Sequence, residues 1–252
     1  MRLSLSSRRV LLILLPGLAA LTLASTTLAF ASPARGAETA LGIAVPTRVP
    51  PPTPLPPPPP EAHIVNLRGH KQAFSLSCEA RAAATWAGYF GVQIDEETFV
   101  RQLPTSDNPD YGFVGDLNGP WGKIPPDGYG VHAWPVAAQL RVYGLNAYAH
   151  RRLTWEDLQR QIAVGQPVIV WVVGHVEPGK AERYVSPTGL TITVARYEHT
   201  VLVTGYTAEA VEILDGKKTY TRPVERFLES WAVLGNMAIV RGLLPVSAPV
   251  SK

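Results

Sequence analysis

The sequence is poor in cysteine, since Cys78 is the single one among 252 residues. An internal disulfide bond is therefore excluded. The chain begins with the pattern of an export signal, and in an oxidising compartment an unpaired thiol is buried and inert, joined to another chain, or reactive. The residues around Cys78 must indicate which of these applies.

The N-terminal segment has the three parts of a secretory signal peptide. Basic residues precede an apolar run at 10–24, and Ala29-Phe30-Ala31 forms a small-x-small cleavage pattern. We therefore assign residues 1–31 as a signal peptide and expect a secreted or extracytoplasmic protein. The alternative is an uncleaved membrane anchor, because residues 10–30 are barely long enough to span a bilayer. No cysteine stands directly after the apolar run, which excludes a lipoprotein anchor.

Residues 32–62 are predicted to be a proline-rich linker. Ten prolines lie between residues 46 and 60, and such a segment favours extended polyproline II without a core of its own. It is either a stiff spacer, which allows association with the cell envelope, or a leader without a role. The remaining chain predicts one domain at 63–245 and a C-terminal tail at 246–252.

The domain also lacks an excess of charge, because residues 61–252 hold 18 basic and 19 acidic residues. Nucleic-acid binding is therefore not expected. There is no internal repeat, no second membrane-spanning run, no H-E-x-x-H motif and no close pair of histidines, so neither a zinc site nor another metal or cofactor is expected. We expect a monomer.

Periodicity and turn residues predict helices early in the domain and strands later. Residues 79–87 favour a helix that is apolar nearly all round and hence buried, with Ser75 or Ser77 as its N-cap. Other predicted helices are 94–103 (capped by Asp95), 134–143, 155–164 (capped by Thr154) and 224–231, and predicted strands are 168–173, 191–195, 200–206, 211–214 and 237–240. This order predicts an α+β fold, with an antiparallel sheet packed against the helix that follows Cys78.

Residues 104–130 form a long loop rich in proline, glycine and aromatic residues. Loops of this length inside a domain are usually functional or disordered, and the aromatic residues favour an ordered loop. It is either a wall of a cleft or a structural cover over the core. If it is a wall, Phe113, Gly115 and Trp121 are the residues expected to contact a substrate.

The chemistry depends on which of six histidines can reach Cys78: His63, His70, His132, His150, His175 or His199. His199 begins a predicted strand, and Asp215 ends the next one. In an antiparallel pair these positions lie at the same edge of the sheet, where a carboxylate can hold the imidazole in one tautomer. The two side chains share a face only if the turn holds an odd number of residues or a β-bulge intervenes.

Gln72 precedes Cys78 by a short segment, and Cys78 stands at the start of the predicted helix. Amide groups at a helix N-terminus lower the pKa of a thiol, and a nearby imidazole lowers it further. The Gln72 amide and the Cys78 backbone N–H could donate to a developing oxyanion.

Taken together, Gln72-x5-Cys78, the run 197–206 with His199, and Leu214-Asp215-Gly216 resemble the C39-like branch of papain-like cysteine peptidases. Segments 112–115, 128–132 and 165–171 resemble it as well. The resemblance implies a papain-like fold and a peptide or protein substrate. It also implies Cys78 as nucleophile, His199 as base and acid, Asp215 as orienting group and Gln72 in the oxyanion hole. The exporter domains of this branch cut leader peptides after double glycine, but this chain lacks transporter segments, so that specificity is not carried over.

The sequence thus favours an exported cysteine peptidase and leaves two alternatives open. Papain-like sites also serve amidases, wall-peptide hydrolases and acyl transferases. A binding module with an inactive site is the other alternative.

Overall fold

The structure is a computed structural model that describes residues 55–242. The predicted signal peptide, the linker up to residue 54 and the tail at 246–252 lie outside the described residues. The limits predicted for the domain therefore stay a prediction. Among residues 55–242, no helix has both the length and the apolar character needed to cross a membrane.

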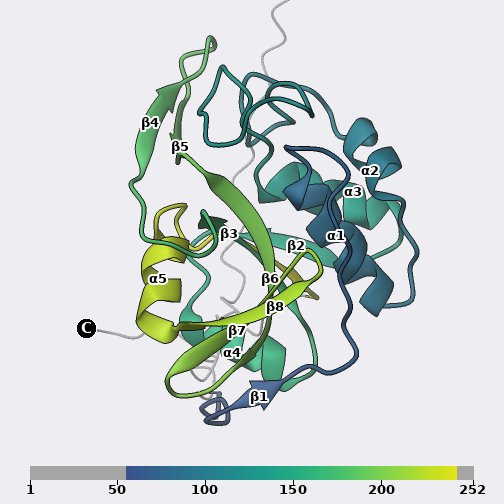
Figure 1. Cartoon of the computed structure of the whole chain (residues 1–252), viewed down its shortest axis with the longest axis vertical. Helices are drawn as coiled ribbons and strands as arrows, with labels where there is room; N and C mark the ends of the chain where they lie inside the picture. The colour runs from purple at the N-terminus through teal and green to yellow at the C-terminus, as the bar shows by residue number, and fades with distance from the viewer. Residues whose placement is uncertain (1–54, 243–252) are drawn as a thin grey trace, which may run out of the picture. The chain divides into compact units, whose positions relative to one another are not determined.

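The core of the fold is an antiparallel sheet. Six strands lie in the order β2 (Ala147–His150), β9 (Ala238–Arg241), β3 (Val168–Val173), β6 (Glu198–Tyr206), β7 (Ala210–Asp215) and β8 (Lys218–Pro223), and β1 (Ala62–His63) pairs with β6. Strands β4 (Glu182–Val185) and β5 (Thr191–Val194) form a separate hairpin, which stands apart from the sheet in Figure 1.

Helices cover both faces of this sheet (Figure 1). The early helices α1 (Cys78–Tyr89), α2 (Glu96–Gln102) and α3 (Ala133–Val142) pack on one face, and α4 (Trp155–Ala163) and α5 (Val224–Ala232) pack on the other. Strand β3 shows why both faces must be covered, because all six of its residues are buried. Ile169 and Trp171 point to the α1 side and Val168 and Val170 to the α4 side, as the two-residue repeat of a strand requires. The predicted α+β fold is confirmed.

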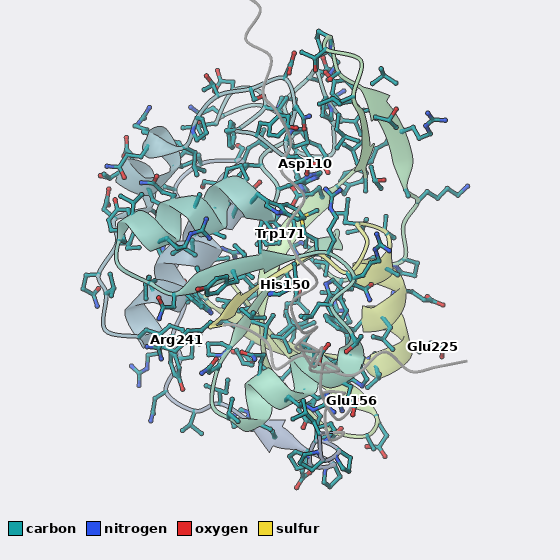
Figure 2. The ribbon with its side chains drawn as sticks, turned by 180° about the vertical axis from the view of Figure 1, so that it is seen from behind. Asp110, His150, Glu156, Trp171, Glu225 and Arg241 are labelled. Carbon is teal, nitrogen blue, oxygen red and sulfur yellow. The ribbon has the colours of Figure 1, made fainter. Side chains whose placement is uncertain are left out.

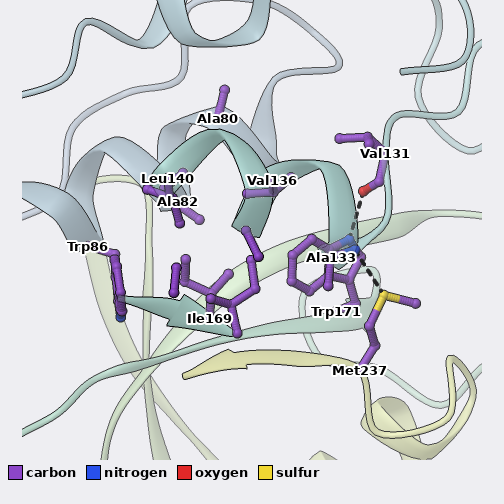
Figure 3. Packing of buried hydrophobic residues seen from close by; sticks show 14 of the residues in the cluster. Ala80, Ala82, Trp86, Val131, Ala133, Val136, Leu140, Ile169, Trp171 and Met237 are labelled. Carbon is purple, nitrogen blue, oxygen red and sulfur yellow. Dashed lines mark hydrogen bonds between the residues drawn. The ribbon is translucent and has the colours of Figure 1, made fainter. Parts of the chain in front are cut away.

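Figure 2 shows the same arrangement from behind, with Glu156 on α4 and Glu225 on α5 at the surface and Trp171 inside the molecule. The close view in Figure 3 shows how Trp171 is held: its indole Nε1 donates to the Val131 carbonyl at 2.9 Å. Trp86 of α1 makes the equivalent bond to the Pro167 carbonyl at 2.8 Å. Both indoles are fully buried, so these bonds satisfy donors that would otherwise be costly inside the core.

Helix α1 is buried from Cys78 to Ala87, which confirms its predicted central place. Of the two predicted N-cap residues, Ser77 is confirmed in position, but its side chain does not cap the helix. Its hydroxyl donates instead to Glu96 Oε1 at 2.6 Å. By contrast, Asp95 and Thr154 cap α2 and α4 as predicted. Short polar strands such as β2, β4 and β8 were not predicted, because half-exposed strands carry little apolar signal.

The loop at 104–130 is ordered and packs on the domain. Isolated bridges join Thr105 to Phe113 and Val114 to Gly130. Phe113 and Tyr129 are 4% and 3% exposed, whereas Trp121 is 38% exposed. The loop is thus a cover in part, and its tryptophan is left at the surface.

Candidate active site

A β-bulge in β6 brings His199 and Asp215 together. Near the turn Tyr206 pairs with Val211, but beyond the irregularity at Thr204 the pairing shifts by one residue. Because a shift of one residue exchanges the faces of a strand, the bulge moves His199 to the face that carries Asp215. His199 Nε2 lies 3.0 Å from Asp215 Oδ1, so the geometric condition that the sequence set is met through the bulge.

Three further side chains contact Asp215, one of them the Tyr220 hydroxyl, which donates to Oδ2 at 3.4 Å. Arg81 of α1 donates from one guanidinium nitrogen to Asp215 Oδ1 at 2.7 Å and from another to the Thr200 carbonyl at 2.6 Å. His175 Nδ1 lies 3.0 Å from Asp215 Oδ2. Burial raises the pKa of Asp215, but the contacts with His199 and Arg81 outweigh it and hold that pKa well below its usual range. Asp215 is therefore ionised and accepts hydrogen bonds only.

The ionised carboxylate decides the tautomer of His199. Because Asp215 can only accept, His199 Nε2 must carry the proton of the 3.0 Å bond, which leaves Nδ1 as the basic atom. Burial lowers the pKa of His199, and Asp215 opposes that effect. The imidazole is 6% exposed and is thus a neutral group with one free basic nitrogen near neutral pH.

Trp121 covers this histidine from the loop. Its ring centroid lies 5.8 Å from those of His199 and His175, and its indole Nε1 donates to the Glu198 carbonyl at 2.8 Å. Of the three loop residues expected at a substrate site, Trp121 is the one that adjoins the His199 ring.

The other two loop residues have different surroundings. Phe113 is buried in the core cluster with α1 and α3, so in this structure it has almost no surface to offer to a substrate. Gly115 is exposed with a φ of +102°, and a Cβ there would lie 2.4 Å from the Gly128 Cα. This close approach of the two backbone segments explains why position 115 is a glycine.

Cys78 lies at the first turn of α1, buried beside two carboxylates. Its side chain is 5% exposed, and the thiol donates to Glu79 Oε2 at 3.4 Å rather than to His199. Burial raises the pKa of the thiol, and the Glu79 and Glu198 carboxylates raise it further, while Arg81 and a backbone hydrogen bond from Thr200 act in the opposite direction. The resting form of Cys78 is therefore the neutral thiol. It lies beside Thr200, the residue that follows His199.

The two glutamates are the main feature that the sequence did not reveal. Glu79 and Glu198 are 1% and 3% exposed, and one oxygen of each lies within 4.8 Å of the other and of the Cys78 sulfur. Burial raises the pKa of Glu79 to about 7, and burial and the nearby Glu79 raise the pKa of Glu198. The backbone N–H of Val131 donates to Glu79 Oε1 at 2.7 Å. Glu79 follows Cys78 and Glu198 precedes His199 in the sequence. The two glutamates lie on α1 and β6, and no local sequence pattern indicates that they meet.

Gln72 is engaged with its own chain. Its side-chain amide donates to the carbonyls of Phe74 and Ser75 at 2.6 Å and 3.0 Å, so the segment before α1 uses both amide hydrogens. Gln72 lines the same cleft as Asp215.

That cleft has a volume of about 660 Å³ and lies between the start of α1 and the β7–β8 turn. Its lining residues are mainly polar and basic: Lys71, Gln72, Arg81, His175, Asp215, Gly216, Lys217, Lys218, Tyr220 and Arg222.

Two side-chain groups at the site have the donor types that metals use: His175 with His199 and Asp215, and Cys78 with Glu79 and Glu198. In the first, Arg81 already supplies positive charge at Asp215, and the imidazole–carboxylate distances of 3.0 Å are those of hydrogen bonds. The side chains of the first group thus already bond to one another or to Arg81. In the second group, Glu198 Oε2 has no hydrogen-bond partner among the described residues.

Comparison with known proteins places this chain in a family. Residues 62–239 match the Peptidase_C39 like family, and the chain belongs to that family. It is 28% identical over 179 residues to the uncharacterized protein YvpB of Bacillus subtilis, covering 65% of this chain and 68% of YvpB. A structure assigned as a C39-like peptidase from Bacillus anthracis aligns with a TM-score of 0.64 at 23% identity, covering 74% of this chain and 98% of that one.

Proposed function

We propose that the protein is an exported thiol hydrolase that cleaves peptide bonds. Cys78 is the nucleophile, His199 the general base and then acid, Asp215 the group that orients the imidazole, and Gln72 a donor to the oxyanion. The observation that carries this proposal is the 3.0 Å contact between His199 Nε2 and Asp215, in a chain whose one cysteine begins the helix packed on the strand of that histidine. Membership of a peptidase family supports the reaction type.

The first step is transfer of the Cys78 proton to His199 Nδ1, the nitrogen that Asp215 leaves free. The thiol must therefore turn away from Glu79 Oε2, its present acceptor at 3.4 Å. The Asp215 carboxylate stabilises the imidazolium that forms, and the buried Arg81 keeps that carboxylate ionised.

The thiolate then attacks the carbonyl carbon of the substrate, and a C–S bond forms as the carbonyl electron pair moves to oxygen. The Cys78 backbone N–H and the Gln72 amide donate to that oxyanion. Gln72 releases one of its bonds to Phe74 or Ser75 to do so. The His199 imidazolium gives its proton to the leaving amine as the C–N bond breaks. Water, deprotonated by His199, then releases the acid and restores the thiol.

A peptide library test examines the reaction directly. The library is incubated with the wild-type protein and with Cys78→Ala, and the products are read by mass spectrometry. Cleavage by the wild type and its loss in Cys78→Ala and His199→Ala support the proposal, whereas His63→Ala, which alters an exposed histidine paired with Glu212, is expected to keep full activity. Added amines separate hydrolysis from acyl transfer, because a transferase would yield amide products.

Thiol labelling provides a second readout. If His199→Ala changes neither the rate at which an alkylating probe labels Cys78 nor the cleavage of peptides, the assignment of the two residues fails.

The export part of the proposal is supported by the pattern of residues 1–31 alone. Expression of the whole gene product, followed by N-terminal sequencing of the mature protein, tests it. A new N-terminus near residue 32 in the extracellular or envelope fraction is expected for a cleaved signal, an intact N-terminus in the membrane fraction indicates an anchor, and a cytoplasmic full-length chain contradicts export.

A further inference from the structure

The cleft beside Asp215 has an uneven distribution of charge. The described residues as a whole contain 17 basic and 19 acidic residues, yet three of their five lysines, Lys71, Lys217 and Lys218, line this one cleft. These three lysines are exposed, and none of them forms an ion pair with another residue of the 55–242 region. The cleft thus concentrates free cationic groups within a region, residues 55–242, that has slightly more acidic than basic residues.

The remaining charged groups of the cleft are already paired. Asp215 is its one carboxylate; Arg81 forms an ion pair with it, and two histidines lie within hydrogen-bond distance of it. Arg222 stacks on Tyr220 with its guanidinium carbon 4.4 Å from the ring centroid and donates from Nε to the His175 carbonyl at 3.2 Å. The two arginines are therefore held by contacts within the protein, whereas the three lysines are free to bind a ligand.

We infer that this cleft binds a peptide through carboxylate groups, so that the preferred substrates carry acidic side chains or a terminal carboxylate next to the bond that is cut. The inference rests on the proposed function, since the cleft shares Gln72 and Asp215 with the candidate catalytic residues. Lysine ammonium groups attract carboxylates as point charges, which gives a preference for acidic residues without demanding one geometry.

A peptide fits this cleft better than a nucleic acid. Nucleic-acid sites combine a basic track with aromatic faces that stack bases. In this cleft the Tyr220 ring already faces Arg222, and the His175 ring lies against Trp121.

Binding is tested apart from catalysis in the full-length protein that carries Cys78→Ala. Two synthetic peptides of equal length are compared by isothermal titration calorimetry, one with glutamates and the other with glutamines at the same positions. The glutamate peptide is expected to bind on the order of tenfold more tightly, since each exposed lysine–carboxylate pair contributes modestly and several can form together. That advantage is expected to shrink at high salt, because salt screens exposed charges.

A pair of charge-matched variants locates the site. In the Cys78→Ala background, Lys217→Gln with Lys218→Gln is expected to remove most of the preference for the glutamate peptide. Lys123→Gln with Lys180→Gln, which changes the net charge equally at exposed positions outside the cleft lining, is expected to keep it. The inference is overturned if the two peptides bind equally, if both double variants have the same effect, or if a single-stranded oligonucleotide displaces the glutamate peptide at far lower concentration than unlabelled peptide does. Acidic-peptide binding without cleavage by the wild type would refute the peptidase proposal alone, and cleavage without any acidic preference would refute this inference alone.

Discussion

Among the substitutions that we propose, Glu198→Gln, which removes a charge, is expected to have the largest effect on the reactivity of Cys78. Glu198 is 3% exposed, and one of its oxygens lies within 4.8 Å of the Cys78 sulfur. At that separation an ionised carboxylate and a thiolate repel each other by about 3 kcal/mol for an effective dielectric constant near 20. Since about 1.4 kcal/mol is tenfold in an equilibrium, Glu198→Gln is expected to raise the thiolate population on the order of a hundredfold where Glu198 is ionised.

The direction of the pH dependence follows from the protons. Burial raises the pKa of Glu198, so at acid pH the wild-type side chain is neutral and resembles glutamine. Its charge appears as the pH rises and then opposes ionisation of the thiol. Wild type and Glu198→Gln are therefore expected to react alike at low pH and to diverge as the pH increases.

The assay is alkylation of Cys78 by iodoacetamide, followed by intact mass from about pH 6 to about pH 10. The ratio of the two rates is informative even though burial slows both. A ratio of at least about tenfold at the alkaline end is expected, after allowance for relaxation of the surroundings. Glu97→Gln, an exposed change on α2, should leave the rate unaltered. If the rates of wild type and Glu198→Gln superimpose at every pH, this electrostatic reasoning is wrong.

Three further changes test the framework of the site. Arg81→Met leaves the partly buried Asp215 without its arginine and is expected to lower the free energy of unfolding by up to about 3–5 kcal/mol, measured by urea denaturation; a loss below about 1 kcal/mol would mean that the pair contributes little. Asp215→Asn removes the group that opposes the effect of burial on His199, so the pKa of that imidazole is expected to fall further, and an unchanged or raised pKa in a proton NMR titration would contradict the proposed pairing. Gly130→Ala places a Cβ 2.2 Å from a buried carboxylate oxygen at a φ of +116°, whereas Gly144→Ala has a φ of +83° and open space around the Cβ. Thermal unfolding should show that Gly130→Ala is clearly more destabilising than Gly144→Ala. Equal losses of stability would mean that backbone conformation alone accounts for the cost.

Several elements could be predicted from sequence because their signal is local. The apolar run of β3, the Asp95 and Thr154 caps and the alanine-rich α1 depend on residues that are neighbours in the chain. The weakly apolar strands β4 and β8 lacked such a signal. The N-cap position of Ser77 was predicted, but the partner of its hydroxyl, Glu96, lies on another helix and could not be predicted from the local sequence.

The sequence by itself determined the strand that begins at His199, the strand that ends at Asp215 and the helix that begins at Cys78, since hydrophobic periodicity and turn residues mark these boundaries. Only the tertiary structure decided how they meet. The bulge at Thr204 sets which face His199 occupies, because a one-residue shift in pairing has no signature in either strand alone. In the same way, the packing of α1 on β6 places Glu79 and Glu198 beside the thiol, and desolvation at that contact sets the protonation of all three groups.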